Sequence, residues 1–385
     1  MFGYKGFDED FKCKDFQYQV DETYKMSDWL IEPCVQGFHF CEYPLNILEF
    51  YGPTAAKFAK INALGLIKTN DDKKFVTNEI RIDEEIEIDD LFKDSINYIN
   101  KHIDSDIKSI ESTTTNRISV APEDHSKVSN DINHSALIAI GDYSISSVSG
   151  AKSCAIATGD RSLAIGKEFK TITANTGSCG ITYNTGDKSI SASTGGYNIA
   201  YNLGVMSVAT VTDENCVAIN KGYFGIAATT NDFSIAHTKG IYSIAACTGD
   251  SSEAISDSTN SPTAINTGCA SIAKSSGYKA VAITTGTNGM SSVDGNLSVA
   301  ISLGYNAIAK GALGSWLVLA EYSGTNDEKI PILLDIKAFK VDGKNILPDE
   351  YYRLKDGKPE CIPGIKTMDN YRTFVLDEEK IGNLK

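Results

Sequence analysis

The sequence of 385 residues lacks several features that commonly fix a function class. No stretch reaches the eighteen or so apolar residues of a membrane-spanning helix, and the segment Met1–Glu9 has no charged and then apolar signal. Its nine cysteines form no Cys-x-x-Cys pair and no regular framework. We therefore expect reduced thiols, no metal site, no membrane partner, and synthesis in the cytoplasm.

Basic charge is also scarce. The chain carries 36 basic and 50 acidic side chains, and the excess of acid is concentrated before residue 135, where 26 acidic side chains face 15 basic ones. Nucleic acids and anionic membranes require a basic patch, so we expect no direct nucleic-acid binding. Residues 135–315 carry 10 basic and 11 acidic side chains, too few carboxylates for a mimic of duplex DNA.

A nine-residue repeat occupies half of the chain. Twenty units run over residues 135–315, with one extra residue that we place near Ala270. In each unit position 2 is usually Ile or Val, position 3 is small, and position 7 is Gly in fifteen units. One short strand and one turn fill nine residues, which predicts a mainly β fold: a nonapeptide-repeat β-solenoid. A two-sided coil of 18 residues is our first choice and a three-sided coil the alternative.

The repeat also predicts which side chains point inward. β-Branched residues suit a packed pleated surface, so we expect the position 2 column inside and the small position 3 residues on a flat outer face. Position 7 is expected to form tight turns that favour positive φ. The predicted core residues are Ile172, Ile181, Ile190, Ile199, Ile226, Ile235 and Ile244, and the representative turn residues are Gly159, Gly177, Gly186, Gly195 and Gly249.

Two repeat families offer comparisons. Calcium-binding nonapeptide repeats need Gly-Gly-x-Gly-x-Asp, and only scattered Thr-Gly-Asp triplets occur here, as at Thr158–Asp160, so we expect no calcium. Segments such as Ser162–Gly166 and Ser298–Ser302 resemble the Ser-Val-Ala-Ile-Gly units of YadA-like trimeric autotransporter heads. The period of nine differs from that family's longer repeat, so the resemblance implies a β-roll and not adhesion.

Residues 1–92 are rich in aromatics and predict a compact α+β domain. A strand is expected at Val35–Glu42, a short helix at Tyr43–Tyr51, and further strands at Lys57–Ile67 and Phe75–Ile82. The segments Gly3–Phe7, Cys13–Tyr18, Gly37–Glu42 and Asn46–Tyr51, together with the repeats and the ending Gly314–Tyr322, are similar to an uncharacterised domain that heads many phage and prophage proteins. The resemblance implies a mobile-element origin and no established activity.

The same domain also resembles ADP-ribosyltransferase-like folds, through a Gly-aromatic-His-Phe strand, a helix with an aromatic end and a later strand that bears Glu. This resemblance implies NAD as cofactor, with His39 at its nicotinamide end and Glu85 or Glu87 orienting the ribose. The alternative interpretation places His39 on an ordinary strand and both glutamates in solvent. The sequence shows no Arg or Ser-Thr-Ser partner motif.

Two further regions flank the repeats. Residues 93–134 predict a polar connector that begins as a helix near Leu91–His102 and continues as the first, irregular coils. Residues 316–385 predict β-strands and hairpin turns, which would either cap the solenoid or form an oligomer interface with Trp316 as an anchor.

Three functions follow from these patterns. The preferred one is a non-enzymatic structural or binding protein, in which a rigid solenoid displays an N-terminal recognition domain. Its partners are expected to be an unidentified host or phage protein and further copies of itself, in the cytoplasm of the host bacterium or in a virion, with antagonism of a host defence factor as one form. The second is the NAD-using ADP-ribosyltransferase-like enzyme. The third is surface recognition, of glycan or ice, by threonines at position 6 such as Thr158 and Thr176.

Overall fold

The structure is a computed structural model that describes residues 1–27, 31–54, 56–71, 73–102, 110–111, 118–325, 331–368 and 370–375. It is mainly β, with a small N-terminal domain and a β-solenoid of about 11 turns over residues 118–319, which confirms the predicted fold class. The chain forms two compact units. Unit 1 comprises Met1–Tyr183, Ala192–Ala200 and Asp213–Cys216, and unit 2 comprises Asn184–Ser191, Tyr201–Thr212 and Val217–Lys385.

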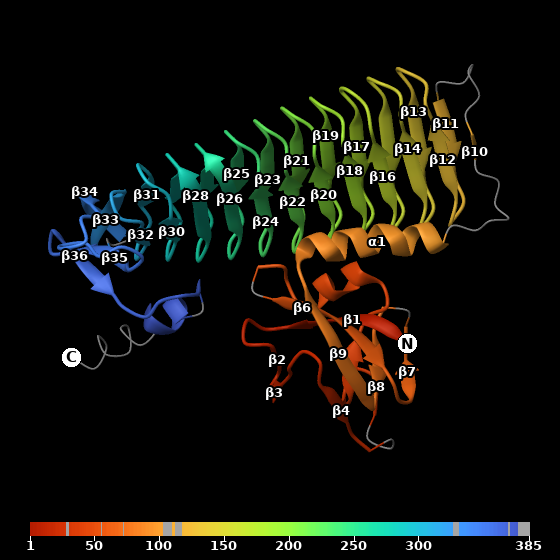
Figure 1. The fold of residues 1–385 in the computed structure, drawn as a ribbon, viewed down its shortest axis with the longest axis horizontal. Coiled ribbons are helices and arrows are strands. Elements are labelled where there is room, and N and C mark those ends of the chain that lie inside the picture. The colour runs from red at the N-terminus through yellow and green to blue at the C-terminus, as the bar shows by residue number, and fades with distance from the viewer. Residues whose placement is uncertain are drawn as a thin grey trace. The chain divides into compact units, whose positions relative to one another are not determined.

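Two antiparallel sheets and a small hairpin build the N-terminal domain in unit 1 (Figure 1). One sheet has the order β1-β6-β9-β4, and the other has the order β5-β8-β7. The strands are β1 (Phe2–Phe7), β2 (Lys12–Cys13), β3 (Phe16–Gln17), β4 (Thr23–Lys25), β5 (Phe38–Phe40), β6 (Lys57–Ala63), β7 (Ile67–Thr69), β8 (Phe75–Thr77) and β9 (Glu79–Ile86).

Helices follow the strands at two places. The predicted short helix is the 3₁₀ helix η2 (Pro44–Glu49), which starts at a proline because the fixed φ of proline suits a first turn. The longer helix α1 (Ile88–His102) begins with Asp89 and Asp90, whose negative charges favour a helix N-terminus. The domain core consists of large side chains such as Phe7, Ile61 and Ile80, all fully buried.

The solenoid coils in unit 1 confirm the two-sided prediction. Strands of four residues alternate between two parallel sheets, and each pairs with the strand 18 residues later, as in Ala136↔Cys154 and Ile145↔Leu163. The strands of this unit are β10 (Ile110–Glu111), β11 (Ile118–Ala121), β12 (Lys127–Asn130), β13 (Ala136–Ala139), β14 (Ile145–Val148), β15 (Cys154–Ala157), β16 (Leu163–Gly166), β17 (Ile172–Asn175) and β18 (Ile181–Asn184).

The same pattern continues through the solenoid coils of unit 2, where Val217↔Ile235 and Val281↔Val299 are paired. Its coil strands are β21 (Val208–Val211), β22 (Val217–Asn220), β23 (Ile226–Thr229), β24 (Ile235–Thr238), β25 (Ile244–Cys247), β26 (Glu253–Asn260), β27 (Thr263–Asn266), β28 (Ile272–Tyr278), β29 (Val281–Thr284), β30 (Met290–Val293), β31 (Val299–Ser302) and β32 (Ile308–Gly311). Strands β19 (Ile190–Ser193) and β20 (Ile199–Asn202) contain residues of both units.

The predicted orientation of the repeat is wrong. Position 3 faces inward: Ala155, Ala164, Thr173, Ala200, Ala218, Ala236 and Ala300 are all completely buried. Position 2 faces outward, and Ile172, Ile190, Ile226 and Ile244 are 45, 40, 38 and 38% exposed, while Ile235 is half-buried. The physical reason is space, because strands joined by such short turns leave a narrow interior that holds mostly small side chains, with a larger one such as Leu137 in a few coils. Of the predicted core residues, only Ile181 and Ile199 are fully buried.

An additional layer explains the burial of Ile181. This residue lies on β18 beside Tyr183, and the Tyr183 ring packs edge-on against Phe92 of α1, with ring centroids 5.4 Å apart. Unit 1 therefore buries outward-facing residues of these coils beneath its own helix.

Polar side chains complete the solenoid interior. The Oγ of Ser162 accepts the backbone N–H of Ser144 at 3.2 Å and donates to the Gly141 carbonyl at 3.1 Å. In unit 2, the amide of Asn220 donates to the Ser207 carbonyl at 2.6 Å, and its oxygen accepts the N–H of Gly222 at 2.9 Å. Ladders of this kind satisfy backbone groups at the coil corners, so a small and partly polar interior is tolerated.

Position 7 forms turns, as predicted, but for a different reason. Positive φ occurs at position 9, for example at Arg161 (52°) and Lys170 (57°), and not at the position 7 glycines 159, 177, 195 and 249. A Cβ at Gly159 would lie 2.2 Å from the Gly141 carbonyl oxygen of the preceding coil. Glycine is required there by the close approach of stacked backbones.

The extra residue of the repeat lies earlier than predicted. In unit 2 the pairing of β26 with β28 shifts register between Asp257 and Asn260, and the step from Glu253 to Ile272 is 19 residues. A bulge absorbs one residue without changing the strands on either side. The prediction near Ala270 is corrected to residues 257–260.

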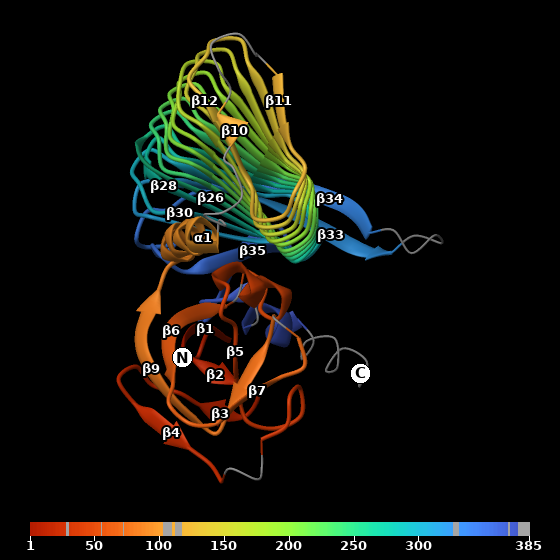
Figure 2. The ribbon, with the colours of Figure 1, turned by 90° about the vertical axis from the view of Figure 1, so that its right-hand side faces the viewer.

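Two hairpins follow the solenoid coils of unit 2, and the first of them is seen in Figure 2. Strand β33 (Trp316–Thr325) continues one solenoid sheet beside β31, and β34 (Pro331–Lys340) pairs with it in the antiparallel direction. Strand β35 (Tyr351–Lys355) pairs with β32 of the other sheet and with β36 (Lys358–Ile362). Both sheets thus receive the predicted closing hairpins. Residues 103–109 and 112–117 of the predicted connector lie outside the described residues.

Candidate functional site

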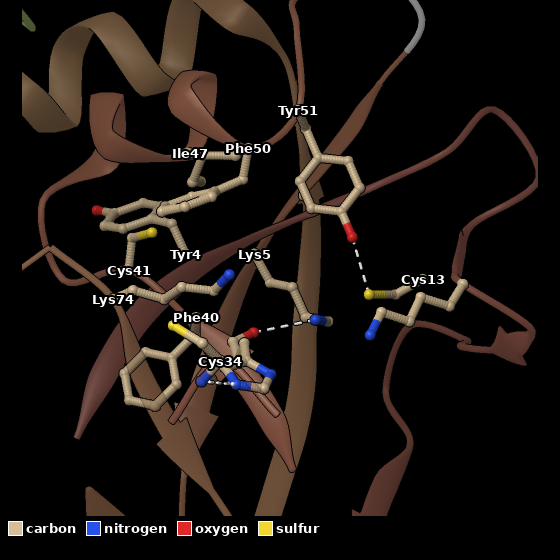
Figure 3. A pocket seen from close by; sticks show the side chains of 13 residues that line it. Tyr4, Lys5, Cys13, Cys34, Phe40, Cys41, Ile47, Phe50, Tyr51 and Lys74 are labelled. Carbon is tan, nitrogen blue, oxygen red and sulfur yellow. Dashed lines mark hydrogen bonds between the residues drawn. The ribbon is translucent and has the colours of Figure 1, made fainter. Parts of the chain in front are cut away.

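A pocket of about 420 Å³ lies in the N-terminal domain (Figure 3). This volume is within the usual range for small-molecule sites. Strand β1, the β2 hairpin, strand β5, helix η2 and the residue before β8 all contribute to its wall. The lining residues are Tyr4, Lys5, Gly6, Cys13, Lys14, Cys34, His39, Phe40, Cys41, Ile47, Phe50, Tyr51 and Lys74.

Lys5 is the most unusual residue of the pocket. It lies in the middle of β1 and is only 3% exposed, although lysine is seldom buried without a partner. Its Nζ donates to the His39 carbonyl at 3.0 Å and lies 5.2 Å from the ring centroid of Tyr18. Burial lowers the pKa of Lys5, and the nearby Lys74 amine acts in the same direction.

Lys74 brings a second amine into the pocket from the start of β8. Its Nζ lies 4.1 Å from the centroid of the Phe50 ring, which is a cation–π contact. Figure 3 shows the side chains of Lys5 and Lys74 reaching into the same space. Within the described parts of the chain, Lys5, Lys14 and Lys74 make no ion pair, and the pocket wall contains no carboxylate.

His39 also lines the pocket, but its ring is already engaged. The Nε2 atom accepts the backbone N–H of Cys34 at 3.0 Å, so it is the unprotonated nitrogen of the ring. Burial, followed by the charges of Lys74 and Lys5, lowers the pKa of His39 to about 4. The imidazole is therefore neutral near pH 7, and the positive charge of the pocket comes from the lysines.

Three thiols complete the wall. The Cys13 Sγ lies 2.8 Å from the Tyr51 hydroxyl, and their contact raises the pKa of Tyr51 further than burial alone. Burial raises the pKa of Cys41 to about 12, so that thiol is inert at neutral pH. Cys34 is exposed. Over the residues that the structure describes, no group of three or more His, Cys, Asp or Glu side chains could hold a metal ion.

Two glycines of β1 allow the aromatic side of the pocket to form. A Cβ at Gly6 would lie 2.5 Å from the Tyr51 ring, and a Cβ at Gly3 would lie 2.6 Å from the Phe40 ring. Only glycine lets these rings rest directly on the strand. The segment Gly3–Phe7 thus places a buried amine between two aromatic contacts.

The structure separates the three residues singled out from the sequence. His39 lies in the pocket, whereas Glu85 and Glu87 are exposed and do not line it. Glu85 lies on β9, in the other sheet, where it pairs with Lys57 at 3.3 Å. The expected histidine–glutamate pair in one cleft is therefore not formed, and ADP-ribosyl transfer stays a prediction.

The sequence analysis did not single out four residues that supply the amines, a buried thiol and an aromatic ring of the pocket wall, namely Lys5, Lys74, Cys41 and Tyr51. One signal was available: a lysine between two glycines in an apolar strand is unusual. Nothing in the local sequence connects it with Lys74, which lies 69 positions later.

A comparison with known protein families matches the N-terminal part of the chain. A family model described as a domain of unknown function (DUF7666) matches residues 1–94. This confirms the predicted uncharacterised domain over about residues 1–92. Searches of curated proteins and of solved structures found no significant match. No helix of the described residues is long and apolar enough to cross a membrane. The chain thus combines an N-terminal segment that is similar to this family model with a nonapeptide β-solenoid.

Proposed function

We propose that this protein is a binding protein, in which the solenoid is a rigid carrier and the pocket of the N-terminal domain binds a small organic anion with a flat apolar part. The single observation behind this proposal is the composition of the pocket wall, which among the described residues has three lysines, no carboxylate, and the rings of Tyr4, Phe40, Phe50 and Tyr51. Burial disfavours the charged form of the Lys5 amine, and a bound anion would stabilise that form. The rings provide apolar area for the rest of the ligand.

A binding role suits the surrounding groups better than catalysis. His39 is neutral and its Nε2 is engaged, Cys41 is protonated, and none of the described residues that line the pocket is a carboxylate. General acid–base catalysis needs a group that titrates near the working pH and can reach the substrate. The thiol and the hydroxyl of the Cys13–Tyr51 pair contact each other instead.

Isothermal titration calorimetry with the full chain tests this proposal. The probes are inorganic phosphate, adenosine monophosphate, NAD and benzoate, each at low ionic strength. We expect at least one aromatic anion to bind more tightly than phosphate. Binding should weaken with added salt, because salt screens the attraction between the anion and the lysine amines.

Two neighbouring lysines provide a matched pair of variants. Lys74→Met removes a pocket amine and is expected to weaken binding by about tenfold or more, the equivalent of one lost charge-assisted contact. Lys73→Met removes the adjacent lysine, which pairs with Glu49 at 2.8 Å outside the pocket wall, and should change affinity less than about twofold. Equal affinity of Lys74→Met and the unaltered chain would contradict the proposal.

Each of the alternative functions predicted from the sequence can be tested separately. Transfer of label from NAD to a protein acceptor, lost in His39→Ala, would replace the binding role by the ADP-ribosyltransferase-like one. The phage or prophage setting, and action on a host factor, rest on the sequence resemblance and are tested by the gene neighbourhood. Glycan binding by the solenoid is tested on a glycan array with the full chain.

A further inference from the structure

The outer strand of the last hairpin, β34, has an open edge and an apolar surface. It is the terminal strand of its sheet in unit 2. Ile332, Leu333, Leu334 and Ile336 are 47, 48, 59 and 48% exposed. Soluble proteins usually protect a long apolar edge strand, since it otherwise pairs with another chain. We therefore expect another strand to pair with this edge of ten residues.

Backbone polarity identifies the groups that the edge offers. The N–H of Val341 donates to the Ser315 carbonyl, and the register runs on through Lys340↔Trp316 to Ile336↔Ala320. Bonded and non-bonded pairs alternate in an antiparallel ladder. The N–H and C=O groups of Ala338 and Ile336 consequently point away from β33, toward the open edge.

The charged residues of β34 indicate which strand pairs with its edge and in which register. Asp335 and Lys337 are the two charged residues at the centre of the strand, and they lie 3.0 Å apart on one face. We propose that β34 pairs in the antiparallel direction with β34 of a second copy of this chain, about a two-fold axis at Ile336. In this register Asp335 of each copy opposes Lys337 of the other, and Leu333 opposes Phe339.

Neighbouring registers are less favourable. A two-fold axis at residue 335 would place two aspartates opposite each other, and an axis at residue 337 would place two lysines together. Like charges directly opposite each other destabilise a strand pair. An axis at Ile336 also joins two edges whose free N–H and C=O groups are complementary, as an isologous contact requires.

The face of the joined sheets would be apolar as well. Trp316 and Val318 lie beside Lys340 and Ala338 on the outer face of the hairpin, and Trp316 is 44% exposed. Pairing two hairpins would give a four-stranded sheet that carries Leu334 and Ile336 from each copy at its centre. Addition of a strand to an exposed edge is a recurrent mode of association.

Light scattering coupled to size-exclusion chromatography tests the register with the full chain. We expect the unaltered protein to have twice the chain mass of 41.5 kDa. Asp335→Lys and Lys337→Asp should each shift the equilibrium at least about tenfold toward the single chain. The double variant Asp335→Lys/Lys337→Asp restores opposite charges and should recover the dimer.

Hydrogen exchange supplies a second measurement. The amides of Ile336 and Ala338 should lose protection as the protein is diluted, while those of the solenoid strands keep theirs. Circular dichroism of each variant verifies that the solenoid is folded. A single-chain mass at all concentrations, a trimer, or a dimer that both single reversals leave intact would overturn the proposal.

Discussion

The N-terminal domain and the solenoid are built on opposite packing rules. The domain core consists of Phe, Tyr, Ile and Leu side chains, which leave an irregular interior and, at one side, a pocket. The solenoid interior consists mostly of Ala, Ser, Thr and Asn side chains and the backbone of glycines, with Val or Leu in a few coils. Large side chains of different shape can enclose a ligand, whereas identical layers of small side chains cannot. The comparison explains why the candidate site lies in the region that has no repeat.

Isoleucine side chains are therefore buried in one region and exposed in the other. In the N-terminal domain Ile61 is completely buried, whereas in the solenoid Ile172 is 45% exposed. Ile61→Ala should lower the free energy of unfolding of the domain by about 2–5 kcal/mol, since it removes buried methyl groups and leaves a cavity. Ile172→Ala should cost less than about 1 kcal/mol. Chemical denaturation followed by circular dichroism measures both, and equal losses would refute the inverted packing.

Two adjacent glycines of one coil differ in the space around them. A Cβ at Gly195 would lie 2.3 Å from the Gly177 carbonyl oxygen, whereas a Cβ at Gly196 would meet nothing nearer than 4.0 Å. Gly195→Ala should therefore destabilise the solenoid by about 2–4 kcal/mol, and Gly196→Ala should stay within about 0.5 kcal/mol of the original. Thermal unfolding of the two variants separates these values. A neutral Gly195→Ala would show that the backbones are not stacked so closely.

Overfilling the solenoid interior is the next largest perturbation. Ala155 is completely buried at position 3, while Ala174, at position 4, is half-buried and faces outward. Ala155→Leu should cost about 1–3 kcal/mol because the neighbouring layers cannot move apart. Ala174→Leu should be close to neutral. If the two variants have the same midpoint of denaturation, the assignment of inner and outer faces is incorrect.

The smallest expected effect concerns acid. The folded pKa of His39 is about 4, below the ordinary value of 6.5, so the unfolded chain takes up a proton first as the pH falls. Stability is therefore lost between about pH 6.5 and pH 4 and changes no further through this group below pH 4. Solvent screening reduces the loss to about 1–2 kcal/mol. His39→Gln should flatten this part of the profile of melting temperature against pH, and an unchanged slope would assign the acid sensitivity to other groups.

Much of the fold was predictable because it repeats. A step of nine residues with a glycine at its end admits few solutions, and the two-sided coil follows from strands of four residues joined by short turns. The prediction failed at Ile172 because alternation along a strand fits either orientation equally well. Hydrophobicity alone favours isoleucine in the interior. The two sheets lie too close together for that, so the small alanine side chains point inward instead.

Of the candidate site, the sequence supplied His39 and the aromatic segments around it. It did not supply Lys74, because that residue reaches the pocket only when β8 pairs with β5. Glu85 was selected for its place in an acidic strand, and in the structure it is exposed, pairs with Lys57 and does not line the pocket.

The period of the coil, its turns and the hairpins that follow the coils could be derived from the amino-acid sequence. Each of these depends on local conformational preference or on a regular spacing, both of which a linear pattern records. The tertiary structure alone decided which face of the repeat is inside and which amines share a pocket. Those outcomes depend on distances between segments remote in sequence, and such distances are set only when the sheets pack.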